Sequence, residues 1–93
     1  MIAIHEAKVI ANEYLENLQK TIGEPIEITK IQEESFGWVF FYQSQDYLKT
    51  GSISSILAGN SPFIVDKRDG TVHVLGTSEP ADFYIKKYAE LHG

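Results

Sequence analysis

The sequence contains no cysteine among its 93 residues. This absence excludes a disulfide framework, a thiolate metal site, an iron–sulfur cluster and a cysteine nucleophile. It also fits a reducing compartment, where thiol crosslinks do not form. A chain of this length is enough for one hydrophobic core and too short for two, so we expect residues 1–93 to form a single domain.

Positive charge is also scarce. Eight lysines and arginines stand against thirteen aspartates and glutamates, which gives a net charge of −5 with histidine neutral. Because nucleic-acid binding depends on basic side chains that neutralise phosphates, we expect no nucleic-acid partner. An acidic membrane surface is disfavoured for the same reason. A basic protein partner is favoured, mainly through a faster association rate.

Long apolar runs are missing as well. No stretch approaches the roughly 20 residues that a membrane span requires. The first residues carry charges throughout and show no apolar segment followed by a small-residue cleavage site. We therefore expect a cytoplasmic protein without a membrane partner.

Hydrophobic periodicity predicts a helix at each end of the chain. Residues 4–20 repeat apolar side chains at three- and four-residue spacing, and Gly23 with Pro25 should end this helix. Residues 79–91 predict a closing helix with Pro80 in its first turn.

The middle of the chain predicts strands. Residues 26–31 alternate until Ile31 breaks the pattern, which indicates either a bulge or the end of the strand near Lys30, and residues 32–37 are typical of a polar turn. In residues 37–44 the side chains of Trp38, Phe40 and Tyr42 share one face, which we assign to the core. Val39, Phe41 and Gln43 share the other face, which we expect to point away from the helices.

A hairpin is predicted from residues 62–67 and 71–75 around Asp69-Gly70. The fifteen residues 47–61 should hold a short helix, with Ser52 as its cap and Gly59 at its end. The expected fold class is α+β. It consists of a four-stranded antiparallel sheet, N- and C-terminal helices packed on one face, and a short helical insert between strands 2 and 3.

No catalytic or metal-binding constellation stands out, and we expect no enzyme activity, no metal and no cofactor. A two-residue turn at Asp69-Gly70 would place Asp66 opposite His73, and a nearby serine could complete a hydrolytic site. An ordinary half-exposed cross-strand pair is the favoured interpretation. A three-residue turn would break this pairing.

Contact with a protein partner is the better-supported prediction. Phe41 and Gln43 lie on the strand face assigned to the outside, and the segment that follows offers further polar and aromatic side chains. Aromatic side chains supply contact area and an aspartate supplies complementarity to a basic partner. The predicted contact residues are Phe41, Gln43, Asp46, Tyr47, Ser52 and Asn60.

Residues 57–84 read LAGNSPFIVDKRDGTVHVLGTSEPADFY. This block closely resembles the signature of the immunity protein 35 family, the YrhB-domain proteins of bacterial polymorphic-toxin systems. Gly37-Trp38 and the segment 47–51 are also similar to that family, so the resemblance spans nearly the whole chain and is loosest over residues 1–35.

The resemblance implies a small α+β protein that binds a cognate toxin domain and blocks it, without catalytic residues of its own. The alternative that it implies is a heat-stable, chaperone-like holdase that binds unfolded chains. An exposed edge strand or the Phe41 face could also support a homodimer.

Overall fold

The computed structural model describes residues 1–51 and 61–92 of the chain. Its first element is the helix α1 (Ile4–Ile22), which buries Ala7, Ala11 and Leu15 against the sheet. The helix begins where the Glu6 carboxylate accepts the Ala3 N–H at 3.2 Å. It ends at Gly23, whose φ of 85° is a left-handed conformation that glycine adopts without a steric penalty. The predicted N-terminal helix and its stop are therefore confirmed.

In the part of the chain that the structure describes, four antiparallel strands follow in the spatial order β1-β2-β3-β4. They are β1 (Ile26–Glu34), β2 (Gly37–Ser44), β3 (Phe63–Asp66) and β4 (Val72–Val74). The pairing of β1 with β2 shifts register between Ile28 and Lys30, so a bulge, one of the two alternatives predicted near Lys30, is confirmed, and the strand does not end there. β1 is longer than expected and continues into the residues predicted to be a turn, because Glu34 pairs directly with Gly37 and only residues 35 and 36 form the turn.

The close approach of β2 to β3 depends on Gly37, the first residue of β2. Its φ is 150°, and a Cβ at this position would clash with the carbonyl oxygen of Val65 and lie 2.9 Å from the Lys67 nitrogen. Only a residue without a side chain allows β2 and β3 to approach this closely.

Besides α1, the described residues form the helices α2 (Gln45–Thr50) and α3 (Ala81–His92). A short helix between strands 2 and 3 is thus confirmed, but it begins earlier than expected, with the Ser44 hydroxyl accepting the Tyr47 N–H at 3.3 Å. The predicted helical segment from Ser52 to Gly59 lies outside the described residues.

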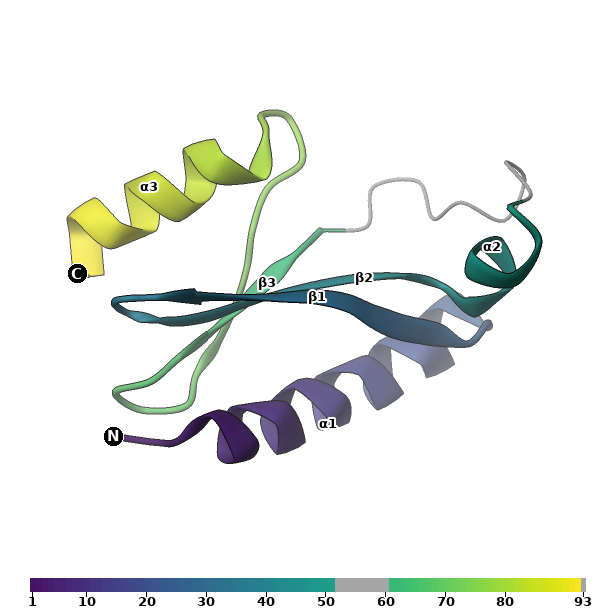
Figure 1. The fold of residues 1–93 in the computed structure, drawn as a ribbon, viewed down its shortest axis with the longest axis horizontal. Coiled ribbons are helices and arrows are strands. Elements are labelled where there is room, and N and C mark those ends of the chain that lie inside the picture. The colour runs from purple at the N-terminus through teal and green to yellow at the C-terminus, as the bar shows by residue number, and fades with distance from the viewer. Residues whose placement is uncertain (52–60, 93) are drawn as a thin grey trace.

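The prediction that both terminal helices pack on one face of the sheet is wrong. Figure 1 shows α1 and α3 on opposite sides of the strands. The α1 cluster contains Trp38, Phe40 and Phe63, whereas α3 packs against Val39 and Ile64.

The physical reason lies in the two central strands. Neither β2 nor β3 has a polar face at its centre, and Val39 and Ile64 are as fully buried as Phe40 and Phe63. Strands with apolar residues on both sides need cover on both sides. One helix cannot supply this cover, so α3 closes the face that α1 leaves open. No helix in the described part of the chain is long and apolar enough to cross a membrane.

Candidate functional site

Four of the six predicted contact residues lie in the described part of the chain, at the end of β2 and in α2. Asp46 is exposed, and Phe41, Gln43 and Tyr47 are half-buried. Gln43 and Asp46 both take part in further interactions. The other two predicted contact residues, Ser52 and Asn60, lie outside the described residues.

The strand face that carries Phe41 is not open as expected. Val39, predicted to point away from the helices, is completely buried beneath α3. Phe41 lies at the border of this cover, half-buried against the α3 cluster, with the Lys30 Nζ 5.3 Å from its ring centroid. The ammonium group therefore lies within the range of a cation–π contact, and only part of the ring remains available to a partner.

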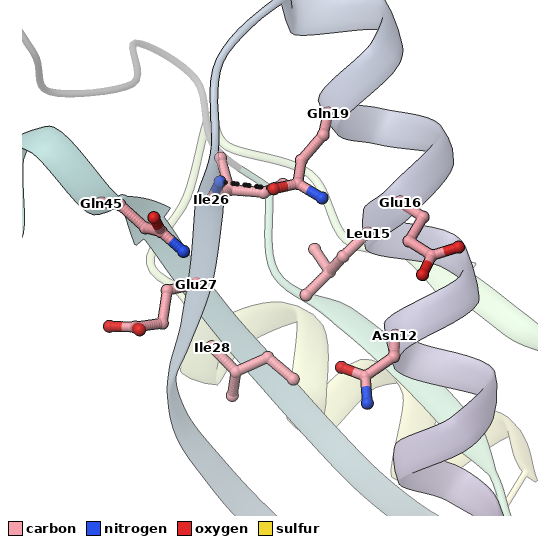
Figure 2. A pocket seen from close by; sticks show the side chains of 8 residues that line it. All are labelled: Asn12, Leu15, Glu16, Gln19, Ile26, Glu27, Ile28 and Gln45. Carbon is pink, nitrogen blue, oxygen red and sulfur yellow. Dashed lines mark hydrogen bonds between the residues drawn. The ribbon is translucent and has the colours of Figure 1, made fainter.

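A hollow lies on the α1 side of the sheet, between α1 and β1. It has a volume of about 530 Å³. Figure 2 shows the side chains of Leu15 and Ile28 directed into this space, with the Gln19 amide oxygen accepting the Ile26 N–H at 3.0 Å. The lining residues are Asn12, Leu15, Glu16, Gln19, Ile26, Glu27, Ile28 and Gln45.

We call this hollow the α1–β1 groove. Its floor is apolar and its walls carry amides from Asn12, Gln19 and Gln45. Glu16 on the helix and Glu27 on the strand flank it from opposite sides (Figure 2). Neither carboxylate forms an ion pair with any residue of 1–51 or 61–92. Residues 1–34 carry seven glutamates and three lysines, which is four of the chain's five net negative charges.

A second hollow continues along the same helix and strand. Its volume is about 500 Å³, and it is lined by Ile4, Lys8, Ile31, Glu33 and Trp38. Ile4 and Ile31 are 39% and 37% exposed, so large apolar side chains meet solvent here. Sequence reasoning missed both hollows. Two features of the sequence could have indicated a binding surface here. One is the seven glutamates of residues 1–34, and the other is Ile31, an apolar residue that falls outside the strand alternation.

A buried polar network ties the opposite face together. The Asp66 carboxylate is 3% exposed and accepts the Tyr88 hydroxyl at 2.6 Å. Arg68 donates to the same carboxylate through Nε at 3.2 Å, Nη2 at 3.0 Å and its backbone N–H at 2.9 Å. The network joins the end of β3 to α3, and its donors satisfy both carboxylate oxygens.

These contacts shift the pKa values of both partners. The hydrogen bond from the Arg68 side chain lowers the pKa of Asp66 well below its usual range, and the Tyr88 hydroxyl and the Arg68 backbone N–H act in the same direction. Burial raises the pKa of Tyr88 to about 12, with a further contribution from the Asp66 carboxylate. The pair is therefore an anionic acceptor held by a neutral donor near pH 7, an arrangement that fixes structure.

The proposed pairing of Asp66 with His73 is wrong. Asp66 and Thr71 close the hairpin instead, with the Asp66 N–H donating to the Thr71 carbonyl at 3.0 Å, so four residues form the loop. His73 is paired with Ile64, and its Nε2 lies 2.6 Å from the Thr71 hydroxyl. Among the described residues, no group of three or more histidines, aspartates and glutamates is placed to hold a metal ion.

The fold and its surfaces define a small α+β domain with an acidic groove along the outer strand of its sheet. Residues 5–90 match the family model described as Immunity protein 35, and the chain belongs to this family. It is 40% identical over 88 residues to the protein YrhB of Escherichia coli K12, which is described as uncharacterized. The alignment covers 95% of this chain and 89% of YrhB. No solved structure matches the chain. The resemblance seen in residues 57–84 is thus confirmed.

Proposed function

We propose that the protein is the immunity partner of a bacterial toxin domain, and that it neutralises this toxin by equimolar binding without chemistry of its own. The observation that carries the proposal is the family match over residues 5–90. The charge balance supports it, because a net charge of −5 favours association with a basic partner.

We propose that the toxin contacts the end of the sheet where β2 runs into α2. Phe41 supplies a half-buried aromatic surface, and Asp46 supplies an exposed carboxylate in the first turn of α2. Gln43 and Tyr47 lie in the same stretch of chain. Ser52 and Asn60 complete the set proposed from the sequence.

The function is tested with the toxin domain encoded by the adjacent gene. We expect co-expression of this protein to restore growth of cells that produce the toxin, and the purified proteins to form an equimolar complex in size-exclusion chromatography with light scattering. Absence of a complex at micromolar concentrations would contradict the proposal.

The contact surface is tested with a matched pair of variants. Phe41→Ala should weaken binding about tenfold or more if the ring is an anchor of the interface. Phe83→Ala is the control, because Phe83 is 49% exposed on α3, away from the proposed contact. Circular dichroism and urea unfolding must show that both variants remain folded. Equal affinities for the two variants would remove Phe41 from the interface.

A holdase activity is the competing candidate, and the exposed Ile4 and Ile31 beside Trp38 are the observation that favours it. A holdase would suppress thermal aggregation of several unrelated client proteins with little preference among them. An immunity protein should leave their aggregation unchanged at equimolar concentration. Light scattering of heated client proteins separates the two functions.

A further inference from the structure

We propose that the outer edge of β1, together with the α1–β1 groove, receives an extended segment of the partner that carries lysine or arginine side chains. The segment would add to the sheet as a fifth strand. This inference rests on the proposed function and adds a second contact surface to the one proposed at the end of β2.

The first support is the position of β1. Within the described residues it is hydrogen-bonded to β2 on one side only, although it is nine residues long. The outer edge of a strand of this length presents a row of backbone donors and acceptors. Addition of an extended peptide to such an edge is a common mode of recognition, in which backbone hydrogen bonds contribute affinity and flanking side chains contribute specificity.

The hydrogen bonds of Ile26 show which way this backbone faces. The Pro25 carbonyl accepts the Gln45 N–H at 3.1 Å, whereas the next N–H along the chain, that of Ile26, is given to the Gln19 side chain of α1. Ile28 has the same orientation as Ile26, because successive residues of an antiparallel edge strand alternate between the neighbouring strand and the outside. The Gln19 side chain therefore accepts a hydrogen bond from an outward-facing N–H of β1, as the backbone of an added strand would do.

The groove supplies room for such a segment. Its volume of about 530 Å³ lies within the usual range of ligand sites, roughly 300–1,000 Å³. Leu15, Ile26 and Ile28 form an apolar floor on which the methylene groups of a lysine or arginine can pack while the charged head stays near water. The second hollow, beside Ile31, extends the same surface toward the start of α1.

The carboxylates beside the groove favour a segment with basic side chains. Glu16 borders the groove on the helix side, and Glu27 lies on the other side of β1, so basic residues on either face of an added strand would meet a carboxylate (Figure 2). Opposite charges on neighbouring strands are favourable and like charges are unfavourable. β1 contains three glutamates and one lysine, so pairing with the β1 edge of a second copy would join two strands of the same net charge.

The test measures the affinity of the full chain for a catalytically inactive form of the toxin domain encoded by the adjacent gene. The variant Glu16→Lys/Glu27→Lys reverses the charges at the groove. The control Glu13→Lys/Glu90→Lys makes the same change in net charge at two other exposed glutamates. We expect the groove variant to lose about tenfold or more in affinity at low salt, and the control to lose about threefold or less.

Hydrogen exchange of the complex provides a second readout. We expect the amide hydrogens of β1 that face away from β2, that of Ile28 among them, to exchange more slowly in the complex than in the free protein.

Equal affinity losses for the two variants, or slowed exchange confined to α3, would overturn the inference and leave the proposed function standing. A concentration-dependent dimer of the isolated protein with slowed exchange in β1 would overturn it in favour of a second copy. If the unaltered protein forms no complex with the toxin domain, the proposed function fails and this inference fails with it.

Discussion

The hydrogen bond between Tyr88 and Asp66 offers a direct test of how α3 is held on the sheet. The Tyr88 hydroxyl donates to a carboxylate that is 3% exposed, at 2.6 Å. Replacing Tyr88 with phenylalanine removes this donor and keeps the ring, which packs 4.7 Å from the ring of Phe36. The perturbation therefore isolates one polar contact between the helix and the strands.

The size of the effect follows from the contacts of the carboxylate. A hydrogen bond to a charged group contributes about 1.5–3 kcal/mol to stability. Because Arg68 still donates to Asp66 from three N–H groups in the variant, the anion keeps other partners. We therefore expect Tyr88→Phe to lower the free energy of unfolding by about 1.5–2 kcal/mol, at the lower end of this range.

Urea unfolding at neutral pH, followed by the fluorescence of Trp38, measures this change. Tyr84→Phe is the matched control, because the Tyr84 hydroxyl bonds to Ser78 at 2.7 Å in an exposed site of the same region. The control should change the free energy of unfolding by less than about 0.5 kcal/mol, as surface substitutions usually do.

The same network predicts a dependence on pH. The pKa of Asp66 is lower in the folded protein than the ordinary value of 3.8, so the unfolded chain takes up a proton first as the pH falls. Stability from Asp66 is fully present above the unfolded pKa and is lost as the pH falls toward the folded one. We expect unfolding free energies to decline from about pH 5 downward, and to decline less in Asp66→Asn.

A double-mutant cycle of Asp66→Asn and Tyr88→Phe measures the coupling between the two side chains. We expect a coupling of about 1 kcal/mol or more, because the residues are in direct contact. The reasoning is refuted if the coupling is zero within error, or if Tyr88→Phe and Tyr84→Phe have the same effect.

Two further substitutions test the packing of the sheet. Gly37→Ala should lower stability by more than about 3 kcal/mol because its Cβ would meet the backbone of β3, whereas Gly23→Ala, with open space around it, should cost only about 1–2 kcal/mol. If thermal unfolding gives the same loss of stability for both variants, the close approach of β2 to β3 does not require glycine at position 37. Phe63→Ala should lower stability by about 3–5 kcal/mol because Phe63 is completely buried. Val74→Ala, at a site 56% exposed, is its control in urea unfolding, and the prediction is wrong if the two losses match.

Local patterns were enough to place most elements. The spacing of Ala7, Ala11 and Leu15 indicated α1, and Gly23 marked its end. The break at Ile31 indicated a bulge or a strand end near Lys30, and the pairing of β1 with β2 shows the bulge. These features depend on interactions within a few residues, so they are visible in the order of the amino acids.

The hairpin shows where local reasoning stops. Asp69-Gly70 correctly indicated a turn, but the loop has four residues, and the resulting two-residue change in register moved the partner of His73 from Asp66 to Ile64. The sequence permits several loop lengths here. The choice depends on how β3 fits between β2 and β4.

The amino-acid order by itself therefore determined the elements, the α+β class and the family, because periodicity, turn chemistry and the block at residues 57–84 are all local. Only the tertiary structure decided that α3 covers the face opposite α1. Val39 and Ile64 come from different strands, and they form an apolar surface that a helix must bury only when β2 and β3 lie side by side. The tertiary structure also decided that Leu15 and Ile28, thirteen positions apart, line one groove beside the edge of β1 that pairs with no other strand of the described residues. A surface built from distant segments depends on packing, which no single stretch of the sequence encodes.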